Sequence, residues 1–156
     1  MKNKNITQLM TKHPMTIGYE DPIQKGSDLM MEHHFRHLPV VDQLGEVIGI
    51  LSDRDVQRAI EVKRHGTEIE YVIATHRKVK DFMSWPPHLI SDHASTLEAI
   101  ESMIEKKISA LLVQSDHTGK IRGILTSEDA LKEFARLLKD DEDFPMDSIP
   151  LARGTD

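Results

Sequence analysis

Two short motifs of the same form carry the residue types in this sequence that could do chemistry. Ser52 stands three residues before Asp55, and Thr126 stands three residues before Asp129. Each hydroxyl residue follows an apolar run, which makes it a natural N-cap, and the acid falls in the first helical turn, where it favours the helix dipole. A helix start also presents free backbone N–H groups that attract anions such as phosphate. The sequence therefore predicts two helix starts that are either simply capped or also bind a ligand.

Motifs of common enzyme classes are missing from the sequence. There is no cysteine, which excludes disulfides, thiolate zinc sites and cysteine nucleophiles. The sequence contains no G-x-S-x-G, G-x-x-x-x-G-K-[ST] or G-x-G-x-x-G motif, so hydrolase, P-loop and Rossmann activities have no support. The nine histidines, including His33, His34 and His37, do not form an H-E-x-x-H pattern. We therefore expect no catalytic residue and no metal site.

The chain repeats itself with an offset of 73 residues, which becomes 74 after one extra residue at a turn. The first offset aligns Met10 with Met83, and the second aligns Gly49 with Gly123. Beyond the turn both copies read G-x-[VI]-x-G-I-L-[ST]-x-x-D, so the two hydroxyl–acid motifs occupy equivalent positions. This self-similarity predicts two related structural units.

Each copy predicts the element order β-α-β-β-α, which gives an α/β (α+β) fold class. A short strand after Pro14 or Pro87 leads into a helix with one apolar face, and two apolar runs joined by a polar turn then lead to the capped final helix. The expected ranges are strands 15–17, 38–41 and 47–51 with helices 23–34 and 53–61, then strands 88–90, 111–113 and 121–125 with helices 96–107 and 127–138. One such unit buries too little apolar surface alone, so we expect a packed pseudo-twofold pair.

These elements divide the chain into a first repeat (1–61), a connector (62–78), a second repeat (79–139) and an acidic tail (140–156). The connector contains Tyr71, Val72, Ile73 and Ala74, and we expect it to be a packed helix. The tail holds six acids and one base, a net charge of −5. A solvated end is the expected state of the tail, and docking onto the body or a partner is the alternative.

Length and charge narrow the class of protein further. The chain has 156 residues and a formal charge of −6, so the body without the tail is close to neutral. A nearly neutral body is a poor nucleic-acid binder, because a clustered basic surface supplies most of that affinity. No apolar run approaches the roughly 20 residues of a membrane span, and the first residues are too polar for a secretory signal. We expect a cytoplasmic protein that binds neither nucleic acid nor a membrane.

The segments LPVVDQLGEVIGILSDRD and ALLVQSDHTGKIRGILTSED resemble the tandem CBS domain, a regulatory module named after cystathionine beta-synthase. The resemblance covers both copies and leaves out the tail and part of the connector. It implies a stand-alone pair of CBS repeats that commonly dimerises as a flat disc of four repeats. It also implies clefts that bind an adenosine-containing ligand, such as AMP, ADP, ATP or S-adenosylmethionine, as a regulator. No cofactor is required by this resemblance.

The resemblance assigns the ribose hydroxyls of such a ligand to Asp55 and Asp129, with Ser52 and Thr126 at the same helix starts. A carboxylate can accept hydrogen bonds from both vicinal hydroxyls, while the helix start faces phosphate. Capping explains Ser52 and Thr126 equally well. For the two aspartates, ribose binding is the favoured interpretation.

Phosphate contacts are expected to be unequal between the two clefts. Related modules use a His and an Arg at the start of the first hairpin strand, which Arg36 and His37 match in reversed order, and Arg54 is a further candidate. The equivalent positions of the second copy carry no positive charge: Ser109, Ala110 and Glu128.

Apolar strand edges are the candidates for contact with adenine. The residues expected there are Thr16, Ile17, Pro39, Leu89 and Ile90. The alternative for these side chains is an ordinary core position. Gly49 and Gly123 either allow the close approach of a ligand or mark a strand bulge.

The favoured function is a non-catalytic regulatory module that senses an adenosine-containing ligand and signals to an unidentified protein target by a conformational or dimer change. The alternative is a ligand-free dimerisation or interaction scaffold with degenerate clefts. An enzyme is the weakest interpretation, since no catalytic constellation is visible.

Overall fold

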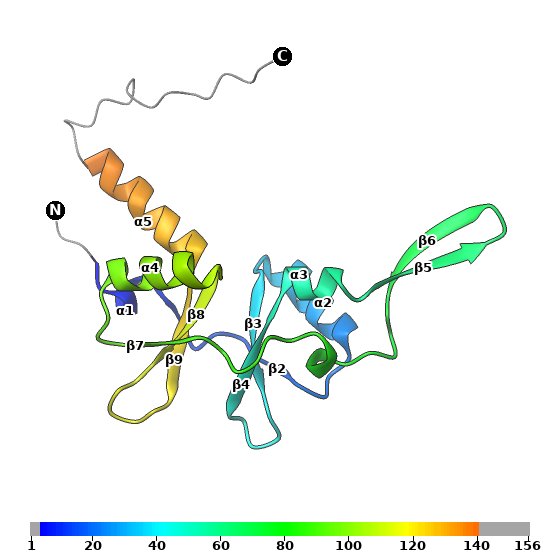
Figure 1. Cartoon of the computed structure of the whole chain (residues 1–156), viewed down its shortest axis with the longest axis horizontal. Coiled ribbons are helices and arrows are strands. Elements are labelled where there is room, and N and C mark those ends of the chain that lie inside the picture. The colour runs from blue at the N-terminus through cyan, green and yellow to red at the C-terminus, as the bar shows by residue number, and fades with distance from the viewer. Residues whose placement is uncertain (1–3, 141–156) are drawn as a thin grey trace, which may run out of the picture.

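The computed structural model describes residues 4–140, which form two lobes, one for each repeat (Figure 1). The first repeat contains β2 Ile17–Gly18, α2 Ile23–His33, β3 His37–Val41, β4 Val47–Ser52 and α3 Asp53–Gln57. The second contains β7 Leu89–Ser91, α4 Thr96–Lys106, β8 Ala110–Gln114, β9 Ile121–Thr126 and α5 Ser127–Asp140. The predicted fold class and the β-α-β-β-α order of both copies are confirmed.

Both repeats build their sheets in the same way. The first strand pairs in parallel with the second (β2 with β3, β7 with β8), and the second pairs antiparallel with the third (β3 with β4, β8 with β9). Ser95 caps α4 as its N-cap, because its side chain accepts a hydrogen bond from the amide of Glu98. Ala99 and Met103 are the buried residues of that helix. The sequence predicts an apolar face that includes Leu97, Met103 and Ile104, and of these only Met103 is buried, whereas Leu97 and Ile104 are exposed.

The segments that begin each repeat are exchanged between the lobes. At the N-terminus, α1 Ile6–Leu9 and β1 Thr11–Lys12 pack on the second repeat, where β1 pairs antiparallel with β9. In return, the 3-10 helix η1 Val79–Asp81 packs on the first repeat. Ile6 and Met10 thus complete the core of the second repeat, and Val79 and Phe82 complete the core of the first. Each lobe therefore depends on chain from both halves of the sequence.

Gly49 and Gly123 make this exchange possible. A Cβ atom on Gly123 would lie 2.6 Å from the carbonyl oxygen of Thr11, and one on Gly49 would lie 2.7 Å from that of Ser84. Only glycine lets the exchanged segment approach the strand so closely. The two glycines are therefore explained by the fold, without a ligand.

A third apolar cluster joins the two lobes. Its buried members come from the facing strands β4, β8 and β9: Ile50, Ala110, Leu112 and Ile124. Burial of these side chains between the sheets supports the expectation that neither repeat is stable alone.

The connector was predicted to be a packed helix, and that prediction is wrong. It forms a hairpin of β5 Ile60–His65 and β6 Glu68–Ile73 that projects from the first lobe (Figure 1). Apolar residues alternate with polar ones along residues 60–63 and 68–71, and Gly66 with φ +66° lies in the two-residue turn. Because Ile60 already belongs to β5, α3 also ends at Gln57, before the expected residue 61.

The predictions for the acidic tail and for a membrane span can be compared with the structure only within the described residues. The acidic tail, apart from Asp140 at the end of α5, lies outside the described residues. No helix within residues 4–140 is long and apolar enough to cross a membrane.

Candidate functional site

Two clefts lie between the repeats, and each combines the helix start of one repeat with the strand starts of the other. The Asp55 cleft, of about 520 Å³, is lined by Ser52, Asp53, Arg54, Asp55, Arg58, His37, Ile50, Ser84, His88, Lys107, Ile108, Ser109 and Ala110. The Asp129 cleft, of about 270 Å³, is lined by Thr11, His13, Pro14, Met15, His34, Phe35, His37, Ile124, Thr126, Glu128, Asp129 and Lys132. Their sizes approach or reach those of small-molecule sites.

The two linings correspond to each other through the sequence repeat. Met15 of one cleft aligns with His88 of the other, and Phe35 aligns with Ile108. Further aligned pairs are Thr11 and Ser84, His34 and Lys107, Ile124 and Ile50, Glu128 and Arg54, and Lys132 and Arg58. The clefts are thus related by pseudo-twofold symmetry, and differences between aligned residues are differences between two versions of one site.

In the Asp55 cleft the predicted motif forms a capping box. The Ser52 backbone N–H and hydroxyl both donate to Asp55 Oδ2, at 2.8 and 2.7 Å, while the Asp55 amide donates back to the hydroxyl at 3.2 Å. Asp55 is buried, and its second oxygen, Oδ1, accepts a hydrogen bond from Arg58 Nη1 at 3.0 Å. Capping therefore uses one oxygen, and the other is held by a cation.

In the Asp129 cleft the same capping box forms, but the second carboxylate oxygen of Asp129 is not bound by a cation as that of Asp55 is. The Thr126 backbone N–H and hydroxyl donate to Asp129 Oδ2 at 2.9 and 2.8 Å. Lys132, which aligns with Arg58, pairs instead with Glu128 at 2.8 Å. Among residues 4–140, Asp129 Oδ1 has no hydrogen-bond partner, so it remains available as an acceptor.

The two clefts also differ in charge. Arg54, Arg58 and Lys107 bring three permanent cations to the Asp55 cleft, against the carboxylates of Asp53 and Asp55. Among residues 4–140, the Asp129 cleft has Lys132 as its one permanent cation, against the carboxylates of Glu128 and Asp129. The Asp55 cleft is therefore the more favourable place for an anion.

His37 is the side chain that both clefts share. Its Nε2 lies 3.0 Å from the Ser109 hydroxyl of the other repeat. Burial lowers the pKa of His37 below its usual value, and the nearby Asp53 opposes this shift. The imidazole is therefore mainly neutral at pH 7, so it enters this region as a hydrogen-bonding group.

Arg36 does not line either cleft. Its Nε donates to Asp53 Oδ2 at 2.9 Å, and its side chain is largely exposed. It also lowers the pKa of Glu128 through its charge, as a lesser cause beside the hydrogen bond from Lys132. Arg36 thus acts on the clefts through neighbouring carboxylates, whereas Arg54 and His37 lie where the sequence analysis expected cleft residues.

The five residues expected to contact adenine are absent from both linings: Thr16, Ile17, Pro39, Leu89 and Ile90. Ile17 and Pro39 are almost completely buried, and Ile90 packs against the core of the second repeat. The strands start later than expected, at Ile17 and Leu89, and residues before these starts, Met15 and His88, line the clefts instead.

Several lining residues were not singled out from the sequence. Met15 and His88 are adjacent to the expected adenine positions, so an error of one or two residues in the strand boundary hid them. His34 and Lys107 end α2 and α4 in the left-handed conformation, at φ 56° and 54°. Glycine is the usual residue at such a helix end. The aligned positions 34 and 107 carry His and Lys instead, and this departure is the sequence feature that could have pointed to them.

Comparison with known proteins agrees with this two-cleft architecture. A family model for the CBS domain matches residues 6–62 and 79–136. The chain belongs to the CBS domain family. CBS domain pairs are generally regulatory rather than catalytic parts of proteins.

Relatives and solved structures extend the comparison. An uncharacterised protein of Methanocaldococcus jannaschii is 29% identical over 144 residues, which cover 89% of this chain and 34% of the relative. The chain spans less than half the length of the curated relatives that it matches: the matched segments cover 34%, 48% and 23% of three of them.

The CBS fold is shared with ligand-bound structures. A CBS domain pair in complex with 5′-methylthioadenosine and S-adenosyl-L-methionine superposes with a TM-score of 0.70 at 20% identity, covering 87% of this chain and 99% of that one. The CBS domain of a bacterial CNNM/CorC family Mg²⁺ transporter in complex with ATP superposes with a TM-score of 0.68 at 18% identity, covering 85% and 87%.

Proposed function

We propose that this CBS domain pair is a non-catalytic regulatory module that binds an adenosine-containing ligand between its repeats. The observation that carries the proposal is the crossed construction of the clefts, each of which joins a capped helix start of one repeat to the strand starts of the other. A ligand seated there touches both repeats, so its binding energy favours one relative arrangement of the lobes. Ligand complexes of the CBS pairs with the same fold support this choice of ligand class.

A phosphate-bearing ligand, such as AMP, ADP or ATP, is proposed for the Asp55 cleft. The carboxylate of Asp55 accepts the ribose hydroxyls, and Arg58 turns from Asp55 Oδ1 to the phosphates. Arg54 and Lys107 line the same cleft and add positive charge. The start of α3 offers no separate anion site, because that helix has only five residues.

The Asp129 cleft is proposed to take an adenosyl group that is not anionic, such as that of S-adenosylmethionine. Its free Asp129 Oδ1 is ready to accept ribose hydroxyls. Glu128 and Asp129 outnumber the single permanent cation, so a sulfonium compound is accommodated better there than a triphosphate.

The test exploits the aligned pair Arg58 and Lys132. ATP binding is measured by calorimetry on wild type, Arg58→Gln and Lys132→Gln. Loss of a charge-assisted contact of about 1.5–3 kcal/mol weakens binding roughly tenfold or more, so we expect that loss in Arg58→Gln. Lys132→Gln removes the equivalent charge from the other cleft and should change the affinity less than about twofold. Equal effects of the two substitutions, or none, would contradict the assignment.

The proposal has further parts: the protein forms a homodimer, lies in the cytoplasm, takes part in energy sensing and signals to a separate protein target. The apolar groove between α4 and α5, lined by Met103, Ile104, Leu131 and Phe134 among others, supports the homodimer. A second copy is proposed as its occupant, because the aligned positions Met31 and Ile60 of the first repeat are also exposed and apolar. Each copy thus offers the same kind of surface on both lobes.

A ligand-free scaffold is the second candidate function. It is favoured by the Arg58–Asp55 ion pair, which already satisfies the buried carboxylate. In that case the dimer forms and no adenosine compound binds, so the ligand and dimer measurements below separate the two functions.

A further inference from the structure

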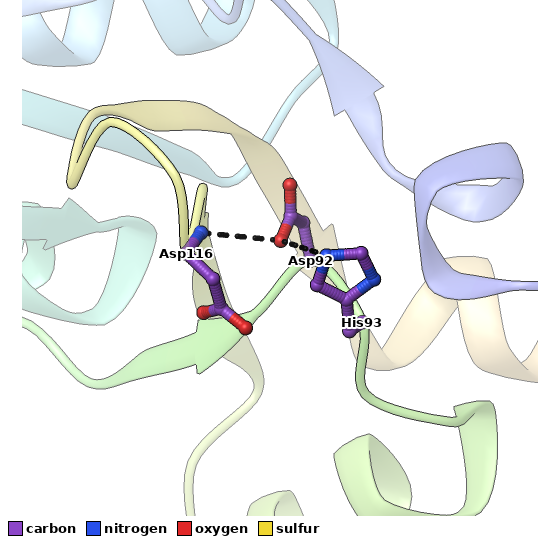
Figure 2. A group of neighbouring side chains, drawn as sticks. All are labelled: Asp92, His93 and Asp116. Carbon is purple, nitrogen blue, oxygen red and sulfur yellow. Dashed lines mark hydrogen bonds and ion pairs between the residues drawn. The ribbon is translucent and has the colours of Figure 1, made fainter.

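A compact group of side chains lies outside both clefts, at the far edge of the second repeat. Asp92 and His93 follow β7, and Asp116 lies in the turn between β8 and β9 (Figure 2). One potential ligand atom from each residue lies within 4.8 Å of those from the other two. Among residues 4–140 this is the one set of three or more His, Cys, Asp or Glu side chains gathered so closely.

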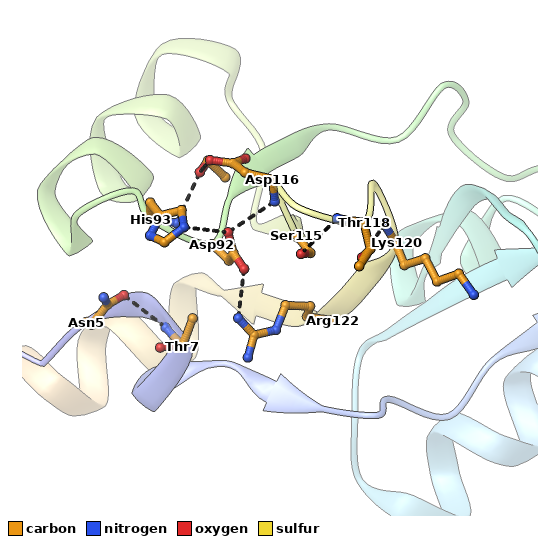
Figure 3. A network of polar contacts seen from close by, with 10 residues as sticks. Asn5, Thr7, Asp92, His93, Ser115, Asp116, Thr118, Lys120 and Arg122 are labelled. Carbon is orange, nitrogen blue, oxygen red and sulfur yellow. Dashed lines mark hydrogen bonds and ion pairs between the residues drawn. The ribbon is translucent and has the colours of Figure 1, made fainter.

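Asp92 is held in place with one oxygen directed at the group. Its side chain is almost fully buried, and Arg122 Nη1 donates to Oδ2 at 2.7 Å (Figure 3). The other oxygen, Oδ1, accepts the Asp116 amide at 3.3 Å and lies 3.7 Å from His93 Nε2.

Asp116 is held in a similar way. The Ser91 hydroxyl donates to Asp116 Oδ2 at 2.7 Å, which leaves Oδ1 free of that contact. Metal-binding carboxylates are commonly oriented by such outer hydrogen bonds. Arg122 and Ser91 are therefore an outer layer around two carboxylates and one imidazole.

The fold itself does not demand this set of residues. In the first repeat the positions aligned with Asp92 and His93 are Tyr19 and Glu20, and Glu20 pairs with Lys78 and Lys80. The same loop is thus built there without an imidazole, and its acid, Glu20, is paired with two lysines. The combination of Asp92, His93 and Asp116 is particular to the second repeat.

We propose that Asp92, His93 and Asp116 bind a divalent transition metal ion such as Zn²⁺. One imidazole with two carboxylates suits such an ion better than Mg²⁺ or Ca²⁺, which prefer oxygen ligands throughout. Ligands at about 2.0–2.2 Å from zinc in a tetrahedral site stand roughly 3.4 Å apart, so the group needs only small side-chain movements to close. The His117 ring, with its centroid 6.4 Å from that of His93, is the candidate for a fourth ligand.

The charge of the group favours a cation. Two carboxylates against the single guanidinium of Arg122 leave a net negative charge, which a bound divalent ion compensates. Metal binding joins the loop before α4 to the turn between β8 and β9. It therefore stabilises the second repeat, and it does so independently of the proposed adenosine ligand.

The sequence predicts no metal site, because it contains no cysteine and no H-E-x-x-H pattern. Asp92 and Asp116 are 24 positions apart in the sequence, and only the pairing of β7 with β8 brings them together.

The test is calorimetric titration of the purified full chain with Zn²⁺ alone. His93→Ala/Asp116→Asn removes two exposed ligands and leaves the buried Asp92 intact. His65→Ala/His76→Ala is the matched control, because it removes two exposed imidazoles that lie beside Glu70 and Glu61 on and next to the hairpin. We expect one ion per chain in wild type and in the control, and at least tenfold weaker binding in His93→Ala/Asp116→Asn.

A second measurement is the thermal unfolding midpoint with and without Zn²⁺, which should rise in wild type and in the control but not in the His93→Ala/Asp116→Asn variant. Absence of stoichiometric binding in wild type overturns the proposal. So does unchanged binding in the His93→Ala/Asp116→Asn variant, or a loss that the hairpin control shows equally.

Discussion

Asp55 and Asp129 are the residues at which the capping of a helix and the proposed binding of a ligand meet. In both repeats one carboxylate oxygen closes the capping box, which satisfies backbone N–H groups that would otherwise lack partners. The other oxygen is bound to Arg58 in Asp55, and in Asp129 it has no hydrogen-bond partner within the described part of the chain. Capping and ribose binding, which the sequence analysis weighed against each other, are therefore compatible in geometry.

The shared histidine predicts a pH dependence of stability. The folded pKa of His37 is lowered, so between this value and the unfolded value of about 6.5 the unfolded chain binds more protons than the folded one. The stabilisation is thus fully present above about pH 6.5 and is lost as the pH falls through the folded pKa. Replacing His37 with Gln should flatten this slope in urea unfolding at pH 5, 6 and 7. Identical slopes in wild type and variant would show that His37 does not carry the effect.

At the residue scale the sequence located the motif residues well. Ser52, Asp55, Thr126 and Asp129 could be placed because capping is a local interaction within four residues. Arg58 and Lys107 could not, since their importance depends on which helix end faces which cleft. That is a property of the packing between repeats.

At the scale of elements, the exchanged segments decide how the lobes are built. Residues 6–10 complete the core of the second repeat although they belong to the first repeat in sequence. The repeat offset aligned these residues with 79–83, but periodicity does not reveal on which lobe a segment packs. The hairpin β5–β6 is not predicted for a different reason: the helix prediction rests on the apolar run of residues 71–74, and a short apolar run does not distinguish a strand from a helix.

Gly123→Ala tests the exchange directly. The new methyl group would stand 2.6 Å from the Thr11 carbonyl oxygen and 2.8 Å from Met10 Sδ, so β1 must shift away from β9. Overpacking of this kind costs about 1–3 kcal/mol, which lowers the thermal unfolding midpoint by several degrees. Urea and thermal unfolding measure the change. An unaltered midpoint would mean that β1 does not need its close approach to β9.

At the scale of the whole molecule, the unpartnered surface between α4 and α5 predicts self-association. Ile104, Leu131 and Phe134 are 72%, 66% and 57% exposed, which is unusual for a contiguous apolar group on a monomer. An interface between two copies related by a twofold axis would bury it. Light scattering should report a dimer for wild type and a monomer for Phe134→Glu.

The control for this prediction is Leu44→Glu. Leu44 is also exposed, at 87%, but it lies in the turn between β3 and β4 and outside the groove. It should leave the dimer intact. A monomeric wild type, or equal effects of both substitutions, would count against the dimer through α4 and α5.

Ligand-dependent unfolding of the ligand-stripped protein tests the central claim most directly. AMP, ADP, ATP and S-adenosylmethionine are compared with their guanosine analogues. A ligand at 100 times its dissociation constant adds about 2.7 kcal/mol, which is roughly 5–11 °C in midpoint for a domain of this size. We predict such a shift for at least one adenosine compound, none for guanosine compounds, and its loss in Asp55→Ala/Asp129→Ala. No shift with any of these compounds, or the same shift in that double variant, would contradict the account.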